Sequence, residues 1–264
     1  MLTGKVAIIY GGGGALGSTA AQVFTKQGAR VFLVDRSQEK LDRITTEITA
    51  AGGDIESNTL DVFDLAAVKK HAAMVAAKTG GIDIAFNAVS VPHDQGTQLA
   101  DLSWDEFMRP VDGFLKAQFN TSKAVAPHMG SKHQGVIINM SEPGAKLAIG
   151  GILGHAVSSA GKEVFTRVLA AELGPQNIRV VGVRPHAMSD APAADSYTKD
   201  VFKPMANAAN LSTEEFMNGM AQGTMIKHLP TLSEVAEIVA FLASDSARTI
   251  TGTTVNVTGG AIAD

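Results

Sequence analysis

Three polar residues recur along one side of a helix predicted over residues 154–173. His155, Ser159 and Lys162 are spaced by four and three positions, which places them on one helical face. Glu142 follows the preceding strand and is expected to project towards His155. A carboxylate beside an imidazole raises the imidazole pKa and fixes its tautomer, so the two would act as a general acid and base. Alternatively, His155 only fills space, Ser159 is an ordinary helix residue and Lys162 is solvated or ion-paired.

A glycine-rich turn near the start of the chain indicates a phosphate site. Residues 6–9 form an apolar run typical of a buried strand, and the glycines Gly11 to Gly14 follow it. A helix is predicted from Ala15, so Leu16 and Gly17 fall in its first turn. Glycines let a phosphate lie against the backbone, and the helix N-terminus offers free N–H groups and a positive dipole. A flexible turn is the alternative, but a strand before it and a helix after it favour a nucleotide-binding βαβ unit.

The elements that must position these residues alternate between strand and helix. This order predicts parallel strands joined by right-handed crossovers, hence an α/β fold with one doubly wound sheet and helices on both faces. We expect a single domain over residues 1–264, with a substrate-side insertion at 187–227 that is either a lid or a surface excursion. The strands are predicted at 6–9, 29–35, 55–60, 82–87, 135–140, 178–184 and 253–257. The helices are predicted at 15–27, 38–51, 65–78, 104–108, 111–128, 154–173 and 233–242.

Composition narrows the possible partners. The chain has a formal net charge of −4 with acids and bases mixed, which gives no basic footprint for nucleic acid or for a membrane surface. No apolar run is long enough to cross a membrane, and the sequence enters a strand directly, so a cytoplasmic protein is expected. The chain has no cysteine, and its seven histidines do not fall at metal-binding spacings, so we expect no metal.

Five short patterns, in this order and spacing, resemble the short-chain dehydrogenase/reductase family. They are Tyr10 to Gly17, Asp35, Asp61-Val62, Asn87-Ala88 and Thr253 to Gly260. The resemblance covers essentially the whole chain. It implies a Rossmann-type fold, an oxidoreductase activity with NAD, and a small-molecule substrate. It also implies a homo-oligomer, a tetramer or a dimer, paired through helices 111–128 and 154–173 and strand 253–257.

The cofactor half of the family pattern is largely present. Asp35 lies eighteen residues after Gly17, where a carboxylate accepts the ribose hydroxyl protons and repels a 2′-phosphate, so NAD is favoured over NADP. Arg36 beside it could hold such a phosphate. Ala15 replaces the middle glycine of the family pattern. By resemblance, the cofactor contacts are Gly11, Gly14, Ala15, Leu16, Gly17, Asp35, Arg36, Asp61, Val62, Asn87 and Ala88.

The residues that carry the family's chemistry are not matched. Family members use a Ser, a Tyr-x-x-x-Lys and a helical Asn. The Tyr transfers the substrate proton, the Lys lowers the Tyr pKa, and the Ser polarises the carbonyl. This chain has no Tyr-x-x-x-Lys, and its tyrosines are Tyr10 and Tyr197. The family positions fall on Glu142 (or Ser141), His155, Ser159 and Phe114 (with Asp112 the nearest polar alternative).

Two further departures concern the nicotinamide end. Val89 stands where the family has a glycine, and Pro185-His186 replaces a Pro-Gly turn that lies against the nicotinamide. The imidazole of His186 is expected to crowd that subsite.

Three hypotheses for the function follow from these matches and departures. The chain is an NAD-linked oxidoreductase with a rebuilt site around His155, a lyase, isomerase or cyclase without hydride transfer, or an inactive nucleotide-binding homologue.

Overall fold

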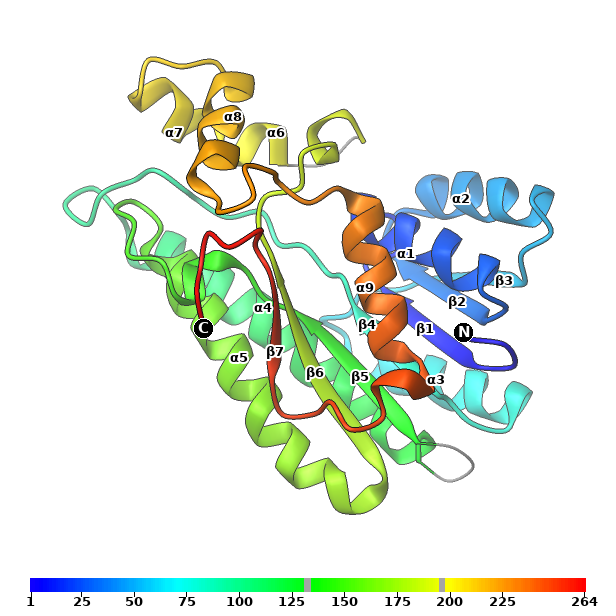
Figure 1. The fold of residues 1–264 in the computed structure, drawn as a ribbon. Coiled ribbons are helices and arrows are strands. Elements are labelled where there is room, and N and C mark those ends of the chain that lie inside the picture. The colour runs from blue at the N-terminus through cyan, green and yellow to red at the C-terminus, as the bar shows by residue number, and fades with distance from the viewer. Residues whose placement is uncertain (131–133, 195–197) are drawn as a thin grey trace.

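A parallel sheet of seven strands forms the centre of the molecule. The computed structural model describes residues 1–130, 134–194 and 198–264. The strands are β1 (Val6–Tyr10), β2 (Arg30–Asp35), β3 (Ile55–Thr59), β4 (Ile84–Asn87), β5 (Gly135–Met140), β6 (Ile178–Pro185) and β7 (Thr254–Val257). Their order is β3-β2-β1-β4-β5-β6-β7, and every neighbouring pair is parallel. The predicted fold is therefore confirmed (Figure 1).

Helices cover both faces of this sheet (Figure 1). One face packs against α1 (Ala15–Lys26), α2 (Gln38–Ala50) and α9 (Leu232–Ala243), and the other against α3 (Leu65–Thr79), α4 (Trp104–Val125) and α5 (Leu153–Leu173). Alternate strand residues point to opposite faces, so Ile9 packs with the first set of helices and Ile8 with the second. Both faces are apolar because both are covered.

The beginnings of three predicted helices are fixed by side-chain caps. The Ser37 hydroxyl accepts the N–H of Lys40, and the Asp64 carboxylate accepts two N–H groups of the first turn of α3. Ser103 and Glu106 form a reciprocal capping box at the start of α4. Each of these caps satisfies N–H groups that have no partner inside the helix.

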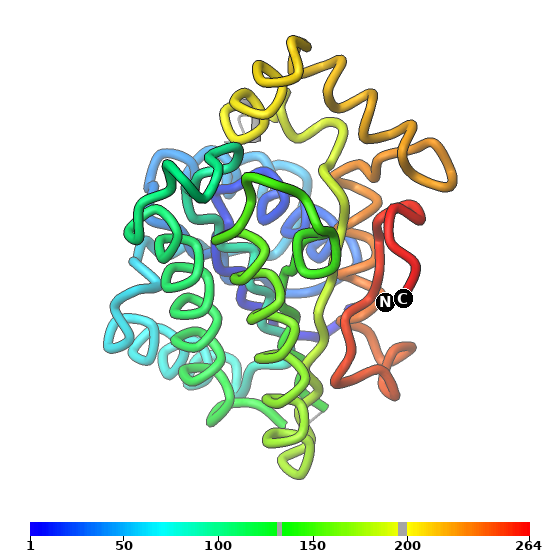
Figure 2. Tube along the Cα trace, turned by 90° about the vertical axis from the view of Figure 1, so that its left-hand side faces the viewer, coloured from blue at the N-terminus to red at the C-terminus, as the bar shows by residue number. Residues whose placement is uncertain are grey.

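Helix α4 differs from the prediction. The sequence predicts separate helices at 104–108 and 111–128, yet one helix runs unbroken from Trp104 to Val125 and contains Pro110, which lacks an N–H group. Helices α4 and α5 lie side by side along their length (Figure 2). Gly154 lets their backbones approach closely at Phe107, and packing on both sides of the proline outweighs its cost. Trp104 is exposed at the start of α4.

Strand order reverses between β1 and β4, and ligands of open α/β sheets bind at such a point. The turn after β1 and the loop after β4 meet there, because Gly11 has no side chain. A Cβ on Gly11 would lie 2.6 Å from the carbonyl oxygen of Ala88. The segment after β6 lies beyond the carboxyl ends of the strands. It folds into α6 (Thr198–Val201), α7 (Lys203–Ala208) and α8 (Thr213–Gly223) (Figure 1). Among the described residues, no helix is long and apolar enough to span a membrane.

Candidate active site

A large pocket lies at the carboxyl edge of the strands, with a volume of about 1010 Å³. One end is formed by the glycine turn and by residues 35–37 and 40. The other end is formed by residues 140–144, His155 and residues 185–188. Side chains of α6, α7 and α8 close the far wall, and they are mostly apolar: Val201, Phe202, Met205, Phe216 and Met220. The pocket therefore joins the two ends that the sequence singled out.

The glycine turn and Asp35 are bonded to each other. The N–H of Gly13 donates to Oδ2 of Asp35 at 3.0 Å, and the N–H of Ser37 donates to Oδ1 at 3.1 Å. A Cβ on Gly13 would lie 2.8 Å from the Asp35 carboxyl carbon, so glycine is required for this approach. Gly14 caps α1 without a side-chain hydrogen bond, which leaves first-turn N–H groups facing the pocket.

The predicted cofactor residues separate into two groups. Gly14, Ala15, Leu16, Asp35, Arg36 and Ala88 line the pocket. Gly11, Gly17, Asp61, Val62 and Asn87 are not among its lining residues. Asn87 turns inward, where its side-chain amide donates to Asn139 at 2.7 Å, and Gly17 allows a close approach to the Gly11 carbonyl. These contacts of Asn87 and Gly17 hold β4 and the turn in place.

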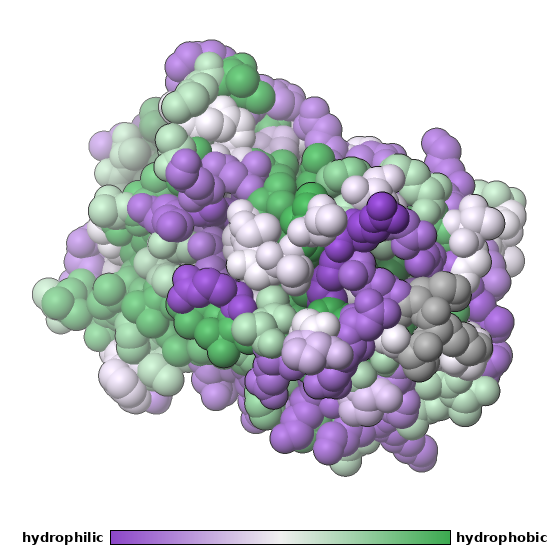
Figure 3. All heavy atoms as spheres, turned by 60° about the horizontal axis from the view of Figure 1, so that its bottom comes forward, coloured by the Kyte–Doolittle hydropathy of each residue, from purple (hydrophilic) through white to green (hydrophobic). Residues whose placement is uncertain are grey.

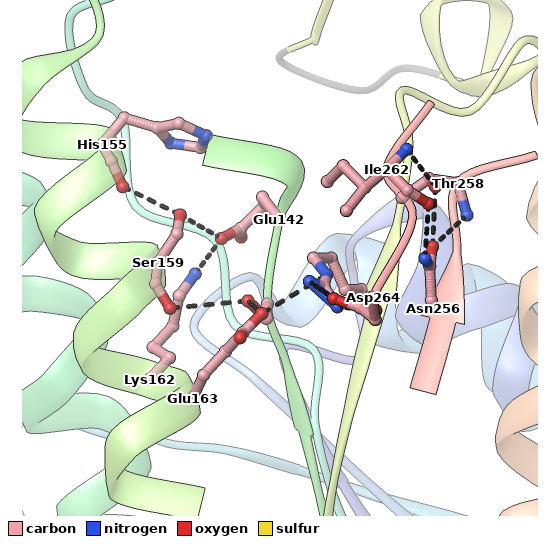
Figure 4. Close-up of polar contacts among 11 residues, drawn as sticks. Glu142, His155, Ser159, Lys162, Glu163, Asn256, Thr258, Ile262 and Asp264 are labelled. Carbon is pink, nitrogen blue, oxygen red and sulfur yellow. Dashed lines mark hydrogen bonds and ion pairs between the residues drawn. The ribbon is translucent and has the colours of Figure 1, made fainter. Parts of the chain in front are cut away.

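At the other end, Glu142 is the centre of a cluster of polar groups (Figure 4). Its carboxylate forms an ion pair with Lys162 and accepts a hydrogen bond from the Ser159 hydroxyl at 2.9 Å. The same hydroxyl oxygen lies 2.8 Å from the backbone carbonyl oxygen of His155, within α5, so its single proton is shared between these two acceptors. His155, Ser159 and Lys162 thus share one buried helix face, as their spacing predicts.

The charges of this cluster are set by burial and by pairing. Burial alone would raise the pKa of Glu142, but Lys162, His155 and Ser159 outweigh it and lower that pKa to about 2. Burial lowers the pKa of Lys162, and Glu142 opposes the change. The side chain of Lys162 is only 1% exposed, and its ammonium lies 4.1 Å from the centre of the Phe114 ring. Phe114, at the family's Asn position, therefore supplies a cation–π contact to this lysine.

His155 lines the pocket beside this cluster. Burial lowers its pKa to about 4, and the opposing effect of Glu142 does not restore it. The prediction of a raised pKa is therefore wrong, because loss of water outweighs the nearby carboxylate. The hydrogen bonds of the Glu142 carboxylate go to Ser159 and Lys162, so Glu142 acts on His155 through charge. The imidazole is neutral at pH 7 and has a lone pair to accept a proton.

Two residues of the group around His155 were not predicted from the sequence. The ring of His93, from the loop after β4, is stacked on His155 with centroids 4.9 Å apart and planes 7° apart. Gln95 lies in the same loop and donates from its amide to Nε2 of His93 at 3.0 Å. Their place in a loop at the carboxyl end of a strand is a signal that could have pointed to them.

The imidazole of His186 lies at the pocket wall, in the turn after β6. Its Nδ1 accepts the N–H of Ala187 at 2.7 Å, and burial lowers the pKa of the ring. The backbone N–H of Ala187 is therefore bonded to His186 and does not point freely into the pocket. Tyr197, the second tyrosine of the sequence, lies outside the described residues.

A second polar chain extends from the site to the last residue of the sequence (Figure 4). Ser141 donates to Glu163 at 2.9 Å, and Arg184 lies 3.4 Å from the same carboxylate oxygen of Glu163. Arg184, which is 1% exposed, also pairs with the side chain of Asp264. These contacts fix the ends of β5 and β6 against α5.

Comparison with known proteins gives matches along the full length. The model of the family described as enoyl-(acyl carrier protein) reductase matches residues 13–261. Oxidoreductase UcpA of Salmonella typhimurium is 32% identical over 98% of this chain and 95% of its own length. The 3-oxoacyl-[acyl-carrier-protein] reductase FabG of Thermotoga maritima is 28% identical over 99% of each chain.

Solved structures agree with these matches. The crystal structure of a putative short-chain dehydrogenase/reductase from Burkholderia xenovorans superposes with a TM-score of 0.82 at 28% identity. The superposition covers 98% of this chain and 97% of that one. An NAD+-bound xylitol dehydrogenase superposes with a TM-score of 0.88 at 23% identity, over 98% and 99% of the two chains, which shows a shared fold.

Proposed function

Because the chain belongs to the short-chain dehydrogenase/reductase family, we propose that it is an NAD(H)-dependent oxidoreductase in which His155 exchanges the substrate proton. The observation that carries this proposal is the position of the His155 imidazole at the pocket wall, where burial lowers its pKa to about 4. The imidazole lies in the same pocket as the glycine turn and beside a carboxylate. Family membership implies a nicotinamide cofactor, while the choice of NAD and the role of His155 rest on the residues of this chain.

The adenosine end of the pocket fits a dinucleotide. The turn has no Cβ at the positions where a phosphate would approach, and α1 presents N–H groups there. Asp35 would accept the ribose hydroxyls, which supports NAD. Arg36 and Lys40 line the same end and would be the groups available to a 2′-phosphate. The carboxylate at the end of β2 decides our assignment, because it would repel that phosphate.

His155 has the chemistry needed for the proton step. When bound, the nicotinamide takes up a hydride from an alcohol carbon or gives one to a carbonyl carbon. In the oxidation direction, the neutral imidazole of His155 accepts the hydroxyl proton. The imidazolium that results lies near the Glu142 carboxylate, which stabilises it, and Lys162 keeps that carboxylate ionised. Ser159 orients Glu142 and does not line the pocket.

The wall opposite the glycine turn indicates the kind of substrate. Phe202, Met205, Phe216 and Met220 of the insertion face the pocket together with Ile152. Unbranched methionine side chains adapt to different shapes. We therefore propose a modest, largely apolar alcohol or ketone as substrate, with α6 to α8 acting as its cover.

The test is incubation with NAD+ or NADH and a panel of apolar alcohols and ketones, monitored by the absorbance of reduced nicotinamide. We expect turnover that is faster with NAD(H) than with NADP(H). The proposal fails if the cofactor binds and no alcohol or ketone of the panel changes the absorbance.

A reaction without hydride transfer is the second candidate. The His186 ring narrows the part of the pocket where the nicotinamide would lie, and it accepts the Ala187 N–H. A lyase or isomerase would use the proton chemistry of His155 and leave the cofactor unchanged. Product formed with no net oxidation or reduction of the nicotinamide would favour this candidate.

We also propose that the protein is a cytoplasmic homo-oligomer, a dimer or a tetramer. Exposed apolar side chains lie on α4 and α5, among them Phe119, Val157, Val164 and Val168. Apolar surface of this kind gathers on the side of the molecule where α5 runs (Figure 3). Light scattering measures the assembly, and Val164→Lys with Val168→Lys should favour the monomer.

A further inference from the structure

His93 brings a second imidazole to the site from a loop outside the helix that carries His155. The two rings are nearly parallel, with centroids 4.9 Å apart and planes 7° apart. The ring of His93 also makes an edge contact with Phe114 of α4, with centroids 5.6 Å apart and planes at 70°. The loop after β4 is thereby in contact with both α4 and α5. The ring of His155 therefore lies against a surface that comes from a separate element.

The hydrogen bonds of His93 select one form of its ring. Nδ1 lies 2.7 Å from the carbonyl oxygen of Val91, which can only accept, so Nδ1 carries a proton. Nε2 lies 3.0 Å from the side-chain amide nitrogen of Gln95, which can only donate, so Nε2 carries a lone pair. Both bonds are satisfied together only by the neutral ring with its proton on Nδ1.

We propose that His93 is a positioning residue for His155, a neutral imidazole locked in one tautomer by Val91 and Gln95 that holds the His155 ring in place. This inference deepens the proposed function, since it takes His155 as the proton acceptor. Keeping His93 neutral leaves His155 as the member of the stack that takes the proton, because two stacked imidazolium rings repel each other.

The surrounding charges are consistent with this division of roles. Glu142 and Lys162 act on both rings, and Asp94 acts on His93. The Asp94 carboxylate is engaged by the N–H and hydroxyl of Thr97, at 3.2 and 2.9 Å. Glu142 is held by Lys162 and Ser159, so its charge is fixed close to the stack.

The test is an NMR titration of the whole chain with 15N-labelled histidine, which reports the protonation of each ring nitrogen without any turnover. In the unmodified protein, we expect His93 to show a proton on Nδ1 and none on Nε2 at pH 7. Gln95→Glu replaces the amide by a carboxylate that accepts from Nε2–H, so His93 should become an imidazolium. The pKa of His155 should then fall by roughly one further unit. Gln95→Met removes the bond without adding charge and should leave His93 neutral.

An Nε2–H tautomer or a protonated His93 at pH 7 in the unmodified protein would overturn the inference. An unchanged His155 pKa in a Gln95→Glu variant whose His93 is protonated would also overturn it.

Activity is a separate readout. His93→Ala should lower kcat about tenfold or more with little change in KM, and His93→Phe, which keeps a stacked ring, should recover most of the loss. If the NMR results are as expected and no oxidation occurs, the proposed function fails and the placement of His93 stands.

Discussion

Lys162 and Glu142 form an ion pair in which the lysine side chain is almost completely removed from solvent, while the glutamate side chain remains about one quarter exposed. The pair joins α5 to the segment after β5. It lies between Ser159, which donates to the carboxylate, and Phe114, whose ring faces the ammonium. A lysine buried to this degree is tolerable only with its partner, so the pair is a structural requirement as well as a source of charge for the site.

Glu142→Gln should therefore destabilise the protein, because it leaves the Lys162 ammonium buried without a counter-charge. We expect a loss of about 3 kcal/mol in the free energy of unfolding, at the low end for buried pairs because the carboxylate is partly exposed. Lys162→Met in the Glu142→Gln background should recover most of that loss, since a thioether packs well against Phe114. Urea unfolding of the two single variants and the double variant measures the coupling. Single losses below about 1 kcal/mol would contradict it.

His155→Gln should abolish most alcohol oxidation while leaving the cofactor end of the pocket intact. Removal of a general base costs roughly 10²- to 10⁴-fold in rate, and we expect a loss in that range in kcat/KM. In the unmodified enzyme, kcat/KM for oxidation should be level above about pH 5 and should fall as pH drops through about 4, where His155 becomes protonated. His128→Gln, outside the pocket, is the matched control. A variant at position 155 that keeps full activity would remove His155 from the mechanism.

The sequence identifies the strands and the helix starts because the signals for them lie within each segment. Apolar runs such as Val31–Val34 are buried on both faces, and caps such as Ser37 mark where helices begin, so the strands and the fold class could be predicted. The predicted gap between helices 104–108 and 111–128 is wrong, because the packing that continues α4 through Pro110 comes from α5, which is distant in sequence.

The candidate site could be predicted only in part. The helix spacing correctly places His155, Ser159 and Lys162 on one face, but spacing says nothing about competition for the Glu142 carboxylate. Likewise, a pKa depends on how much water the fold removes, which is why the expected direction for His155 is wrong. His93 reaches the site through the path of a loop, which periodicity does not describe.

His71 should make stability fall as the solution becomes acidic. It is 5% exposed, and burial lowers its pKa to about 4 from an ordinary value of 6.5. Between these values the unfolded chain binds a proton that the folded chain excludes, so stability is lost as pH falls from about 6.5 to about 4. At 1.36 kcal/mol per unit, the loss approaches about 3 kcal/mol. His71→Gln retains a donor for the side chain of Asn58 and removes the titration.

Urea unfolding of the unmodified protein and of His71→Gln, from pH 7 to pH 4, measures this contribution. The unmodified protein should lose more stability than the variant across the range, with the difference appearing below about pH 6.5. Parallel curves at every pH would show that His71 is protonated equally in both states. Because other buried histidines remain in both proteins, only the difference between the curves is assigned to His71.

Asp35 should determine which dinucleotide binds. Calorimetric titration with NADH, NADPH and ADP-ribose should show tighter binding of NADH than of NADPH, because a 2′-phosphate would approach the Asp35 carboxylate. Asp35→Asn keeps the size of the side chain and removes its charge, so the preference for NADH should fall on the order of tenfold. Arg36 and Lys40 remain at the same end of the pocket to bind the phosphate. A preference unchanged by Asp35→Asn would show that another group selects the cofactor. In the same titrations, equal affinities for NADH and ADP-ribose would show that the wall at His186 contributes nothing to nicotinamide binding, whereas tighter binding of NADH is expected for an oxidoreductase.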